Sequence, residues 1–391
     1  MYQIRKTQKE YCCDPWNGKY EKRIEVLKLA KKQHRNTVAF LYPGFDSSTF
    51  RYRGYNVSET LDYSMYWSGA YFELADLANL TEDVSVIDVM VIIRCEWDDE
   101  LEQFITLIKS RGIKLCYDVD DLIYNPKYMK EVINAIGLKK EDYSYWFGLT
   151  TRHSVIAEKC DAYITTNEYL AKYLRDDYQK DCYVIKNYLN WTQEKVSEYY
   201  FQQKMEMDSE KPFTIGYFSG SPTHVKDLMV ALPEIEELFE KYEDVKLQIV
   251  GYMNLPNEYG KWIKKGRIEY IPFQTFVGLQ YEQAKVDVNI VPLVNNVFSN
   301  CKSELKYFES AIVGTITCAT PSFTYSSAIS SGDNGYICEK GEWFSTLEKI
   351  YKEGVTNEKK QHIRDVALKE YSNYHQLGHV ECVFDSILNG R

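Results

Sequence analysis

Short apolar runs rich in β-branched and aromatic residues alternate with longer segments of helical periodicity along most of the chain. Each run is apolar throughout, which suits the strands of a parallel sheet that is covered on both faces. A helix is expected over 21–35, where apolar residues recur at helical spacing and cations gather at the end. Alternating strands and helices predict an α/β fold with doubly wound, Rossmann-like sheets. In the first half we expect strands at 38–42, 89–94, 114–118, 162–166 and 182–185.

The same alternation starts again after a polar segment, 191–211, which lacks a strand pattern and is followed by Pro212. We interpret this segment as a linker between domains. A chain of 391 residues is longer than one ordinary domain. We therefore predict two Rossmann-like domains facing each other across a cleft, residues 1–205 and 206–375. In the second we expect strands at 214–218, 246–251, 268–272, 286–292 and 315–319, and helices at 228–242 and 302–313.

The last helical stretch, 360–388, is expected to return toward the first domain, with 376–391 as the crossing segment. In doubly wound folds, ligands bind at the carboxyl ends of the strands. Candidate site residues should therefore follow the predicted strands directly.

Charge and motif content exclude several classes of protein. The formal net charge of −10 argues against a general nucleic-acid binder, because neutralising phosphates requires a basic surface. The six histidines form no HExxH motif, and the chain has neither a Gly-x-Ser-x-Gly motif nor a Walker lysine-serine pair. Metalloprotease, hydrolase and P-loop functions therefore lack support. The ten cysteines are irregularly spaced, which reduced cytosolic thiols explain.

The sequence also bears on location. No run approaches the ~18 apolar residues of a membrane span, and the N-terminus has no apolar signal region. We expect a cytoplasmic protein, and a peripheral contact with the inner face of the membrane stays open. The 34 tyrosines fit two interpretations, AT-rich coding or an aromatic surface that binds sugars or membrane.

The densest group of candidate residues lies in the segment FSNCKSELKYFESAIVG, 298–314. On the predicted helix, Lys302, Lys306 and Glu309 share one face at spacings of four and seven. A helix start at Ser303 would attract phosphate, and two lysines beside it would strengthen that anion site. A carboxylate two turns deeper can accept hydrogen bonds from ribose hydroxyls, so this pattern indicates a nucleotide. The alternative is an ordinary amphipathic helix with a solvated Lys/Glu face.

The longer segment DVNIVPLVNNVFSNCKSELKYFESAIVGTITCAT resembles the nucleotide-sugar segment of GT-B-fold glycosyltransferases of family 4. That family usually carries two glutamates separated by seven residues. Glu309 matches the second, which in the family binds the donor ribose, whereas the first falls on Cys301 here. The resemblance implies a GT-B architecture with a nucleotide-sugar donor in the second domain.

A second candidate group lies in IGYFSGSPTHVKDL, 215–228. Gly220 and Ser221 would permit close approach of the backbone to a ligand, and Lys226 lies where a cation could reach a pyrophosphate. The segment resembles the first strand, turn and helix of the family's donor domain. A tight strand-to-helix connection without a ligand is the alternative.

In the first half, YPGFDSSTFRYRGYN follows the first strand. Gly44 allows a turn, and Arg51 and Arg53 bring two guanidiniums to the loop. Because arginine grips phosphate or carboxylate with two parallel hydrogen bonds, we predict binding of the donor pyrophosphate or of an anionic acceptor. The alternative is a pair of surface arginines.

The segment YDVDDLIY ends the predicted strand 114–118 with three carboxylates, Asp118, Asp120 and Asp121. One of them could hydrogen-bond the acceptor or assist its deprotonation. Helix capping and a metal-binding DxD are alternatives. YDVDDLI also resembles a segment of bacterial polysaccharide enzymes of family 4. His153, which we place at the start of a helix, is a candidate catalytic residue, with a structural histidine as the alternative.

Taken together, the resemblance implies a retaining glycosyltransferase. It would move a sugar from a nucleotide-sugar donor to a glycan, lipid-linked or protein-linked acceptor in bacterial surface glycan synthesis. Two-domain transferases of this kind generally work without metal, so no cofactor is expected. Three alternatives stay open: a non-catalytic partner subunit of a transferase complex, which the missing first glutamate fits, a nucleotide-sugar epimerase, and a glycan-binding module.

Overall fold

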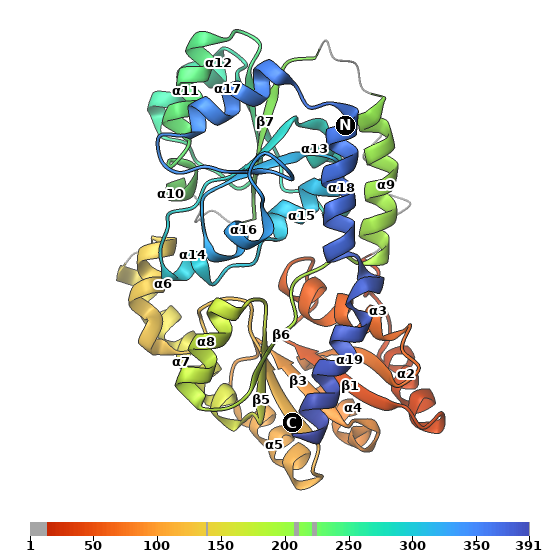
Figure 1. Ribbon diagram of the computed structural model, residues 1–391. Helices are drawn as coiled ribbons and strands as arrows, with labels where there is room; N and C mark the ends of the chain where they lie inside the picture. Colours follow the sequence, from red (N-terminus) through yellow and green to blue (C-terminus); the bar gives the residue numbers. More distant parts are fainter. Residues whose placement is uncertain (1–13, 138–139, 207–210, 221–224, 391) are drawn as a thin grey trace. The chain divides into compact units, whose positions relative to one another are not determined.

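The computed structural model describes residues 14–137, 140–206, 211–220 and 225–390, which form two compact units (Figure 1). Of these, 14–190, 301–303 and 372–390 make up the N-terminal unit. The described parts of 191–300 and 304–371 make up the C-terminal unit. The chain therefore passes between the units more than once.

The N-terminal unit contains a six-stranded parallel sheet in the order β2-β1-β3-β4-β5-β6. Its apolar runs form central strands as predicted, because helices bury them on both faces. The edge strand β2 was not predicted, since its sequence WSGAYFE mixes small and polar residues with aromatic ones. The strands are β1 (Asn36–Tyr42), β2 (Trp67–Glu73), β3 (Val89–Ile93), β4 (Lys114–Asp118), β5 (Ala162–Thr165) and β6 (Cys182–Val184).

Helices of the N-terminal unit pack on this sheet through apolar stripes. In α5 (Asp99–Ser110) the buried residues are Leu101, Phe104, Ile105 and Ile108, the spacing of one helical face. The other α-helices are α2 (Tyr20–Lys32), α3 (Asn56–Leu61), α4 (Leu77–Glu82), α6 (Met129–Ile136), α7 (Tyr143–Lys159), α8 (Glu168–Tyr178) and α19 (Asn373–Asn389). Shorter turns are the π-helix η1 (Arg51–Tyr55) and the 3-10 turns η2 (Leu74–Asp76), η3 (Val84–Val86), η4 (Pro126–Tyr128) and η5 (Lys140–Asp142).

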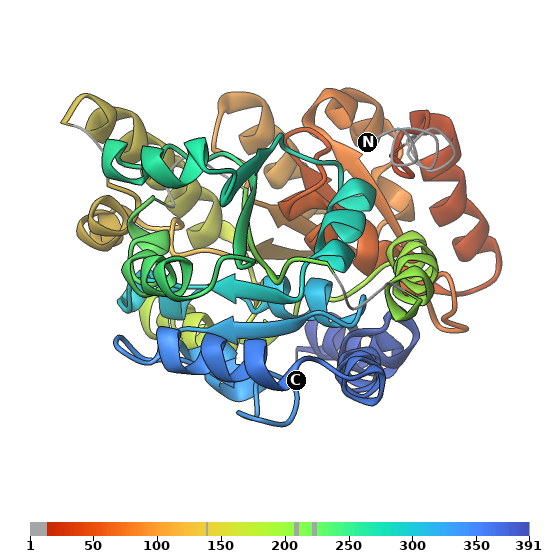
Figure 2. The same cartoon turned by 90° about the horizontal axis from the view of Figure 1, so that it is seen from above.

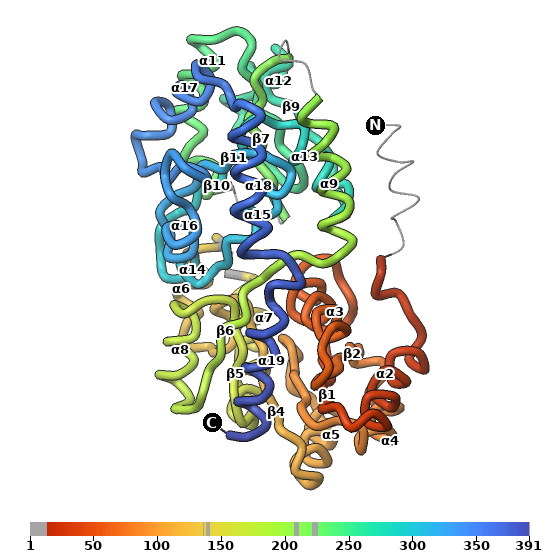
Figure 3. The backbone as a smooth tube through the Cα atoms, turned by 45° about the vertical axis from the view of Figure 1, so that its right-hand side comes forward, coloured from red at the N-terminus to blue at the C-terminus, as the bar shows by residue number. Residues whose placement is uncertain are grey.

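The C-terminal helix α19 belongs to the N-terminal unit. It lies beside the strands of that unit in Figures 1 and 3. Trp67 Nε1 donates a hydrogen bond to Asp385 Oδ1 at 2.9 Å. Phe384 meets Phe40 of β1 edge-on, with ring centroids 5.9 Å apart. A residue near the C-terminus thus completes the core of a sheet built from the first half of the chain.

The C-terminal unit contains a second six-stranded parallel sheet, in the order β12-β11-β10-β7-β8-β9. Strand order reverses between β7 and β10, which makes this the switch point of a doubly wound sheet. Figure 2 shows helices on either side of these strands. The strands are β7 (Thr214–Ser219), β8 (Lys246–Gly251), β9 (Ile268–Ile271), β10 (Val288–Val291), β11 (Ile316–Ala319) and β12 (Tyr336–Ile337).

The segment that we interpreted as a linker contains a long helix, α9 (Trp191–Met205), which belongs to the C-terminal unit. It runs beside α18 in Figures 1 and 3. Between these helices, Arg364 Nη2 donates a hydrogen bond to Glu198 Oε2 at 2.5 Å. The remaining elements are α10 (Val225–Leu228), α11 (Leu232–Lys241), η7 (Asn257–Tyr259), α12 (Gly260–Lys264), α13 (Phe276–Lys285), α14 (Val297–Asn300), α15 (Leu305–Ala311), α16 (Phe323–Ala328), α17 (Trp343–Glu353) and α18 (Asn357–Tyr371).

The predicted fold class is confirmed: both units are doubly wound α/β structures with parallel sheets. Within the described parts of the chain, we find no helix with the length and apolar character that crossing a bilayer demands.

Candidate functional site

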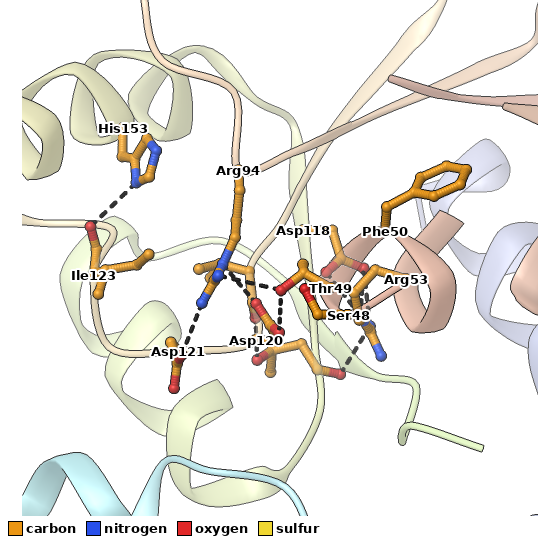
Figure 4. A network of polar contacts seen from close by, with 12 residues as sticks. Ser48, Thr49, Phe50, Arg53, Arg94, Asp118, Asp120, Asp121, Ile123 and His153 are labelled. Atoms are coloured by element: carbon orange, nitrogen blue, oxygen red, sulfur yellow. Dashed lines mark hydrogen bonds and ion pairs between the residues drawn. The ribbon is translucent and has the colours of Figure 1, made fainter. Parts of the chain in front are cut away.

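In the N-terminal unit, charged side chains gather at the carboxyl ends of β3 and β4 (Figure 4). Arg53 of η1 is fully buried and donates from Nε to Asp118 Oδ1 at 2.9 Å and from Nη2 to Oδ2 at 2.8 Å. Its other hydrogen bonds go to the carbonyls of Ile185 and Thr165 and to Asn187 Oδ1. With its donors occupied, Arg53 orients Asp118 and the loop, and gripping a phosphate would require breaking this pair.

The alternative of two surface arginines is wrong, because Arg51 and Arg53 are both buried. Arg51 Nε donates to the Ser47 carbonyl at 2.7 Å, and its guanidinium lies 4.2 Å from the centroid of the Tyr52 ring. Both arginines sit in a π-helical turn, a geometry that is frequent at functional sites. Gly44 lies in the exposed turn before it, and a side chain there would meet nothing.

Arg94, which the sequence analysis treated only as the end of a strand, joins the other two carboxylates. Its Nε lies 2.6 Å from Asp120 Oδ1, and its Nη2 donates to Asp121 Oδ2 at 2.8 Å. Thr49 Oγ1 accepts from Arg94 Nη1 at 3.2 Å and donates to Asp120 Oδ2 at 3.1 Å. Arg94 has φ of 48°, a strained value for a residue with a side chain. Arg94 could have been predicted as a site residue, because it is an arginine directly after an apolar strand.

His153 lies apart from these carboxylates. It sits in the third turn of α7, which begins at Tyr143, so the expectation that His153 opens a helix is wrong. The helix starts earlier because the aromatic residues of YSYWF are helical too. In Figure 4 the ring points toward Ile123, whose carbonyl lies 3.3 Å from Nδ1. Burial and then the charge of Arg94 lower the pKa of His153 to about 4, so the imidazole is neutral at neutral pH.

In the C-terminal unit, the predicted helix 302–313 is shorter than expected. α15 begins at Leu305, and Glu304 before it has ψ of 24°, outside the helical range. The expectation that Lys302, Lys306 and Glu309 share one helical face is therefore wrong for Lys302. The helix starts late because the segment Cys301–Ser303 belongs to the N-terminal unit and is held by contacts within it.

Two asparagines of the N-terminal unit hold that segment. Asn167 Nδ2 donates to the Cys301 carbonyl at 2.8 Å, and Asn187 Nδ2 donates to Ser303 Oγ at 3.0 Å. Cys301 itself is buried, and burial raises the pKa of its thiol above its usual range. The position where the family carries its first glutamate thus holds a neutral, enclosed side chain.

Lys306 and Glu309 do lie on α15, which follows β10 at the switch point. Glu309 is only 2% exposed, so the alternative of a solvated Lys/Glu face is wrong for this residue. The Nζ of Lys306 lies 5.5 Å from the ring centroid of Tyr217, on the neighbouring strand β7. The helix that follows β10 thus carries a buried carboxylate and a cation, and the cation lies against the neighbouring strand β7.

Two further residues that the sequence analysis did not single out line this region. Glu304 is buried and accepts a hydrogen bond from Tyr371 Oη at 2.9 Å. Burial, and next the charges of Glu304 and Glu309, raise the pKa of Tyr325 above its usual range. Tyr325 lies on α16, which follows β11, so three segments bring polar groups to the same edge of the sheet.

The other predicted donor residues lie at the end of β7 and beyond. Gly220 directly follows β7 and is exposed, with room for a side chain around it. Ser221 lies outside the described residues. Lys226 is exposed on α10 and lines an open pocket of about 770 Å³, together with Glu234, Glu237, Lys340 and Phe344.

Over the residues that the structure describes, no three His, Cys, Asp or Glu side chains group closely enough to hold an ion.

Comparisons with known proteins give a clear result for the fold alone. No protein-family model matches the chain, and no curated protein matches it in sequence. Among solved structures, HepE of Anabaena in complex with UDP and glucose superposes with a TM-score of 0.60 at 10% identity, over 90% of this chain and 100% of that one. Sucrose-phosphate synthase from Thermosynechococcus elongatus gives 0.60 at 12% identity, over 91% and 100%. A glycosyltransferase from Rickettsia africae gives 0.58 at 13% identity, over 91% and 100%. This chain shares the two-domain α/β fold of these glycosyltransferases.

Proposed function

We propose that this protein is a glycosyltransferase that takes its sugar from a nucleotide-sugar donor bound by the C-terminal unit. The observation that carries the proposal is the buried carboxylate of Glu309, with Lys306 on the same helix, at the switch point of a doubly wound sheet. Ligands of such sheets bind at the switch point. The similar structure of HepE contains UDP and glucose, which supports a nucleotide-sugar as the ligand.

In this proposal Glu309 accepts hydrogen bonds from the donor ribose, as the resemblance to family 4 implies. Lys226 and Lys306 of the C-terminal unit supply positive charge for the departing diphosphate, the kind of electrostatic stabilisation that usually contributes most to catalysis. The same resemblance adds three further parts to the proposal. These are retention of anomeric configuration, a glycan, lipid-linked or protein-linked acceptor, and a role in bacterial surface glycan synthesis. No metal is required.

The N-terminal unit would bind the acceptor. Asp120 and Asp121 keep partly open positions at the carboxyl edge, where Arg94 orients them. Asp118 is fully committed to Arg53, so it acts in this proposal by positioning the loop.

The test is nucleotide binding by matched variants. We expect the wild-type chain to be stabilised against heat by one of UDP, GDP, dTDP or their sugars, because a ligand that binds only the folded protein stabilises it by mass action. Glu309→Gln should weaken that binding by about 10- to 100-fold, since hydrogen bonds to charged groups contribute ~1.5–3 kcal/mol.

Glu282→Gln is the matched control. Glu282 is also a buried carboxylate of the C-terminal unit, but it lies on α13, where it accepts a hydrogen bond from Gln248 Nε2 at 3.0 Å. Binding that is unchanged in Glu309→Gln, or weakened equally in both variants, would remove the nucleotide assignment from Glu309. A wild-type chain that binds none of these nucleotides would remove the function.

One observation favours a second candidate, a non-catalytic partner subunit of a transferase complex. Cys301 is a buried thiol whose backbone is fixed by Asn167, so it offers no carboxylate where the family has one. The two candidates separate in one assay. Release or transfer of sugar from a nucleotide sugar by the isolated chain supports the enzyme, whereas nucleotide binding without turnover supports the partner subunit.

A further inference from the structure

Two half-exposed aromatic rings stack on each other at the carboxyl edge of the second sheet. Tyr252 directly follows β8, and Phe273 follows β9 after a single proline. Their ring centroids are 5.5 Å apart and the ring planes are inclined by 29°. Tyr252 is 50% exposed and Phe273 is 52% exposed, so each ring still presents apolar surface to solvent.

The two rings come from neighbouring strands. β8 and β9 are parallel with Val250 opposite Ile271, and Tyr252 and Phe273 each lie two residues beyond this last pair. The two rings therefore form a continuous surface, which we term the aromatic platform.

The platform lies against the end of β7. The backbone N–H of Tyr252 donates to the Ser219 carbonyl at 3.3 Å. Gly251 makes this approach possible, because a Cβ at that position would lie 2.0 Å from the same carbonyl oxygen. Ser219 is the last residue of β7 and Gly220 opens the turn that was predicted to approach the donor phosphates. The backbone of Tyr252 is thus one strand spacing, ~4.8 Å, from the end of β7, and Phe273 follows the strand beyond it, because β8 lies between β7 and β9.

We propose that the aromatic platform formed by Tyr252 and Phe273 stacks against the heterocyclic base of the nucleotide donor. The inference rests on the proposed function, since it names the residues that hold the base of that donor. An aromatic face suits a base because every base has a π-face, and such stacking contributes about 1–3 kcal/mol per base. Phosphates gain nothing from it, so the platform distinguishes a nucleotide from other phosphorylated ligands.

The experiment compares nucleoside diphosphates with inorganic pyrophosphate as ligands of the full chain, by calorimetric titration. In Tyr252→Ala the affinity for the nucleoside diphosphate that binds the wild type best should fall by about 5- to 100-fold. The affinity for pyrophosphate should stay within about twofold of the wild type. Tyr252→Phe keeps the ring and should restore nucleotide binding, and Phe273→Ala should lower it as Tyr252→Ala does.

Tyr199→Ala is the matched control, because Tyr199 is a tyrosine of the same unit with 53% exposure, on α9. It should bind nucleotide as the wild type does. The inference is overturned if Tyr252→Ala binds nucleotide as the wild type does, or if its affinity for pyrophosphate falls as much as its affinity for nucleotide. It is also overturned if only the affinity for the nucleotide sugar falls, because the platform would then contact the sugar. Failure of the proposed function gives a different result, because the wild type itself would then bind no nucleotide. That result would contradict both proposals.

Discussion

Arg53 and Asp118 are joined by three hydrogen bonds, of 2.8, 2.9 and 3.2 Å, although 65 positions separate them in the sequence and both side chains are buried. Asp118 ends β4 and Arg53 belongs to the π-helical turn η1. The pair therefore fixes η1 on the carboxyl edge of the first sheet. That edge also carries Asp120 and Asp121, so the pair determines the backbone on which the proposed acceptor site depends.

Removing one partner of this pair should destabilise the protein severely. In Arg53→Met the carboxylate of Asp118 would be left buried without its partner. Such a change typically lowers the free energy of unfolding by about 3–5 kcal/mol. The double variant Arg53→Met/Asp118→Leu should recover most of the loss, because an apolar pair of similar volume needs no compensation. Chemical denaturation of the two variants checks this. A single variant as stable as the wild type would contradict it.

His153 should make stability depend on pH. Its pKa is 6.5 in an unfolded chain and about 4 in the folded protein, where burial and Arg94 disfavour the charged ring. Between these values the unfolded chain binds the extra proton. The free energy of unfolding is therefore unaffected by this proton above about pH 6.5, falls as the pH drops toward 4, and changes no further below. The total loss is on the order of 3 kcal/mol.

The measurement compares wild type with His153→Gln in urea unfolding from pH 7 to pH 4. The difference in unfolding free energy between the two should shift by that amount over this range, in favour of the variant at low pH. Titration of the His153 ring by NMR provides an independent readout. A midpoint near 6.5 would show that the ring is not buried as described.

Gly251 should tolerate alanine less well than another glycine of similar backbone conformation. Gly251 has φ of 98°, and its added Cβ would lie 2.0 Å from the Ser219 carbonyl oxygen. Gly341 has φ of 92° with nothing within 4 Å. Gly341→Ala isolates the cost of the backbone conformation, about 1 kcal/mol. Gly251→Ala adds the clash and should cost at least about 2 kcal/mol more.

Thermal unfolding of both variants gives the comparison. If Gly251→Ala unfolds at the same temperature as Gly341→Ala, then β8 does not approach β7 as closely as the structure has it. The aromatic platform would then lose the contact that places it beside the donor turn.

Several features of this protein could be predicted from local patterns. The strands β1, β3, β4 and β7 can be recognised in the sequence as apolar runs, because a strand that is covered on both faces needs apolar residues at every position. Strand and helix alternate visibly in both halves, and this alternation leads to doubly wound sheets. Asp120 was found because the end of a strand can be recognised in the sequence, and Glu309 because it lies on a predicted helix that resembles a family segment.

Local patterns failed where a contact with a distant segment overrode them. The edge strand β2 forms from WSGAYFE because β1 pairs with it along its whole length, from Asn36 to Tyr42. The helix expected to begin at Lys302 begins at Leu305, since Asn167 and Asn187 hold the residues before it. Periodicity within one segment contains no information about such partners.

The sequence by itself determined the class of fold, the approximate strands and the chemical types of residue at their ends. Only the tertiary structure decided that Arg53 is committed to Asp118, that Arg94 joins Asp120 and Asp121, and that Tyr252 stacks on Phe273. Hydrophobic patterning is a local property of the chain, whereas strand order and register determine which side chains meet. For that reason the residue types could be predicted from the sequence and their partners could not.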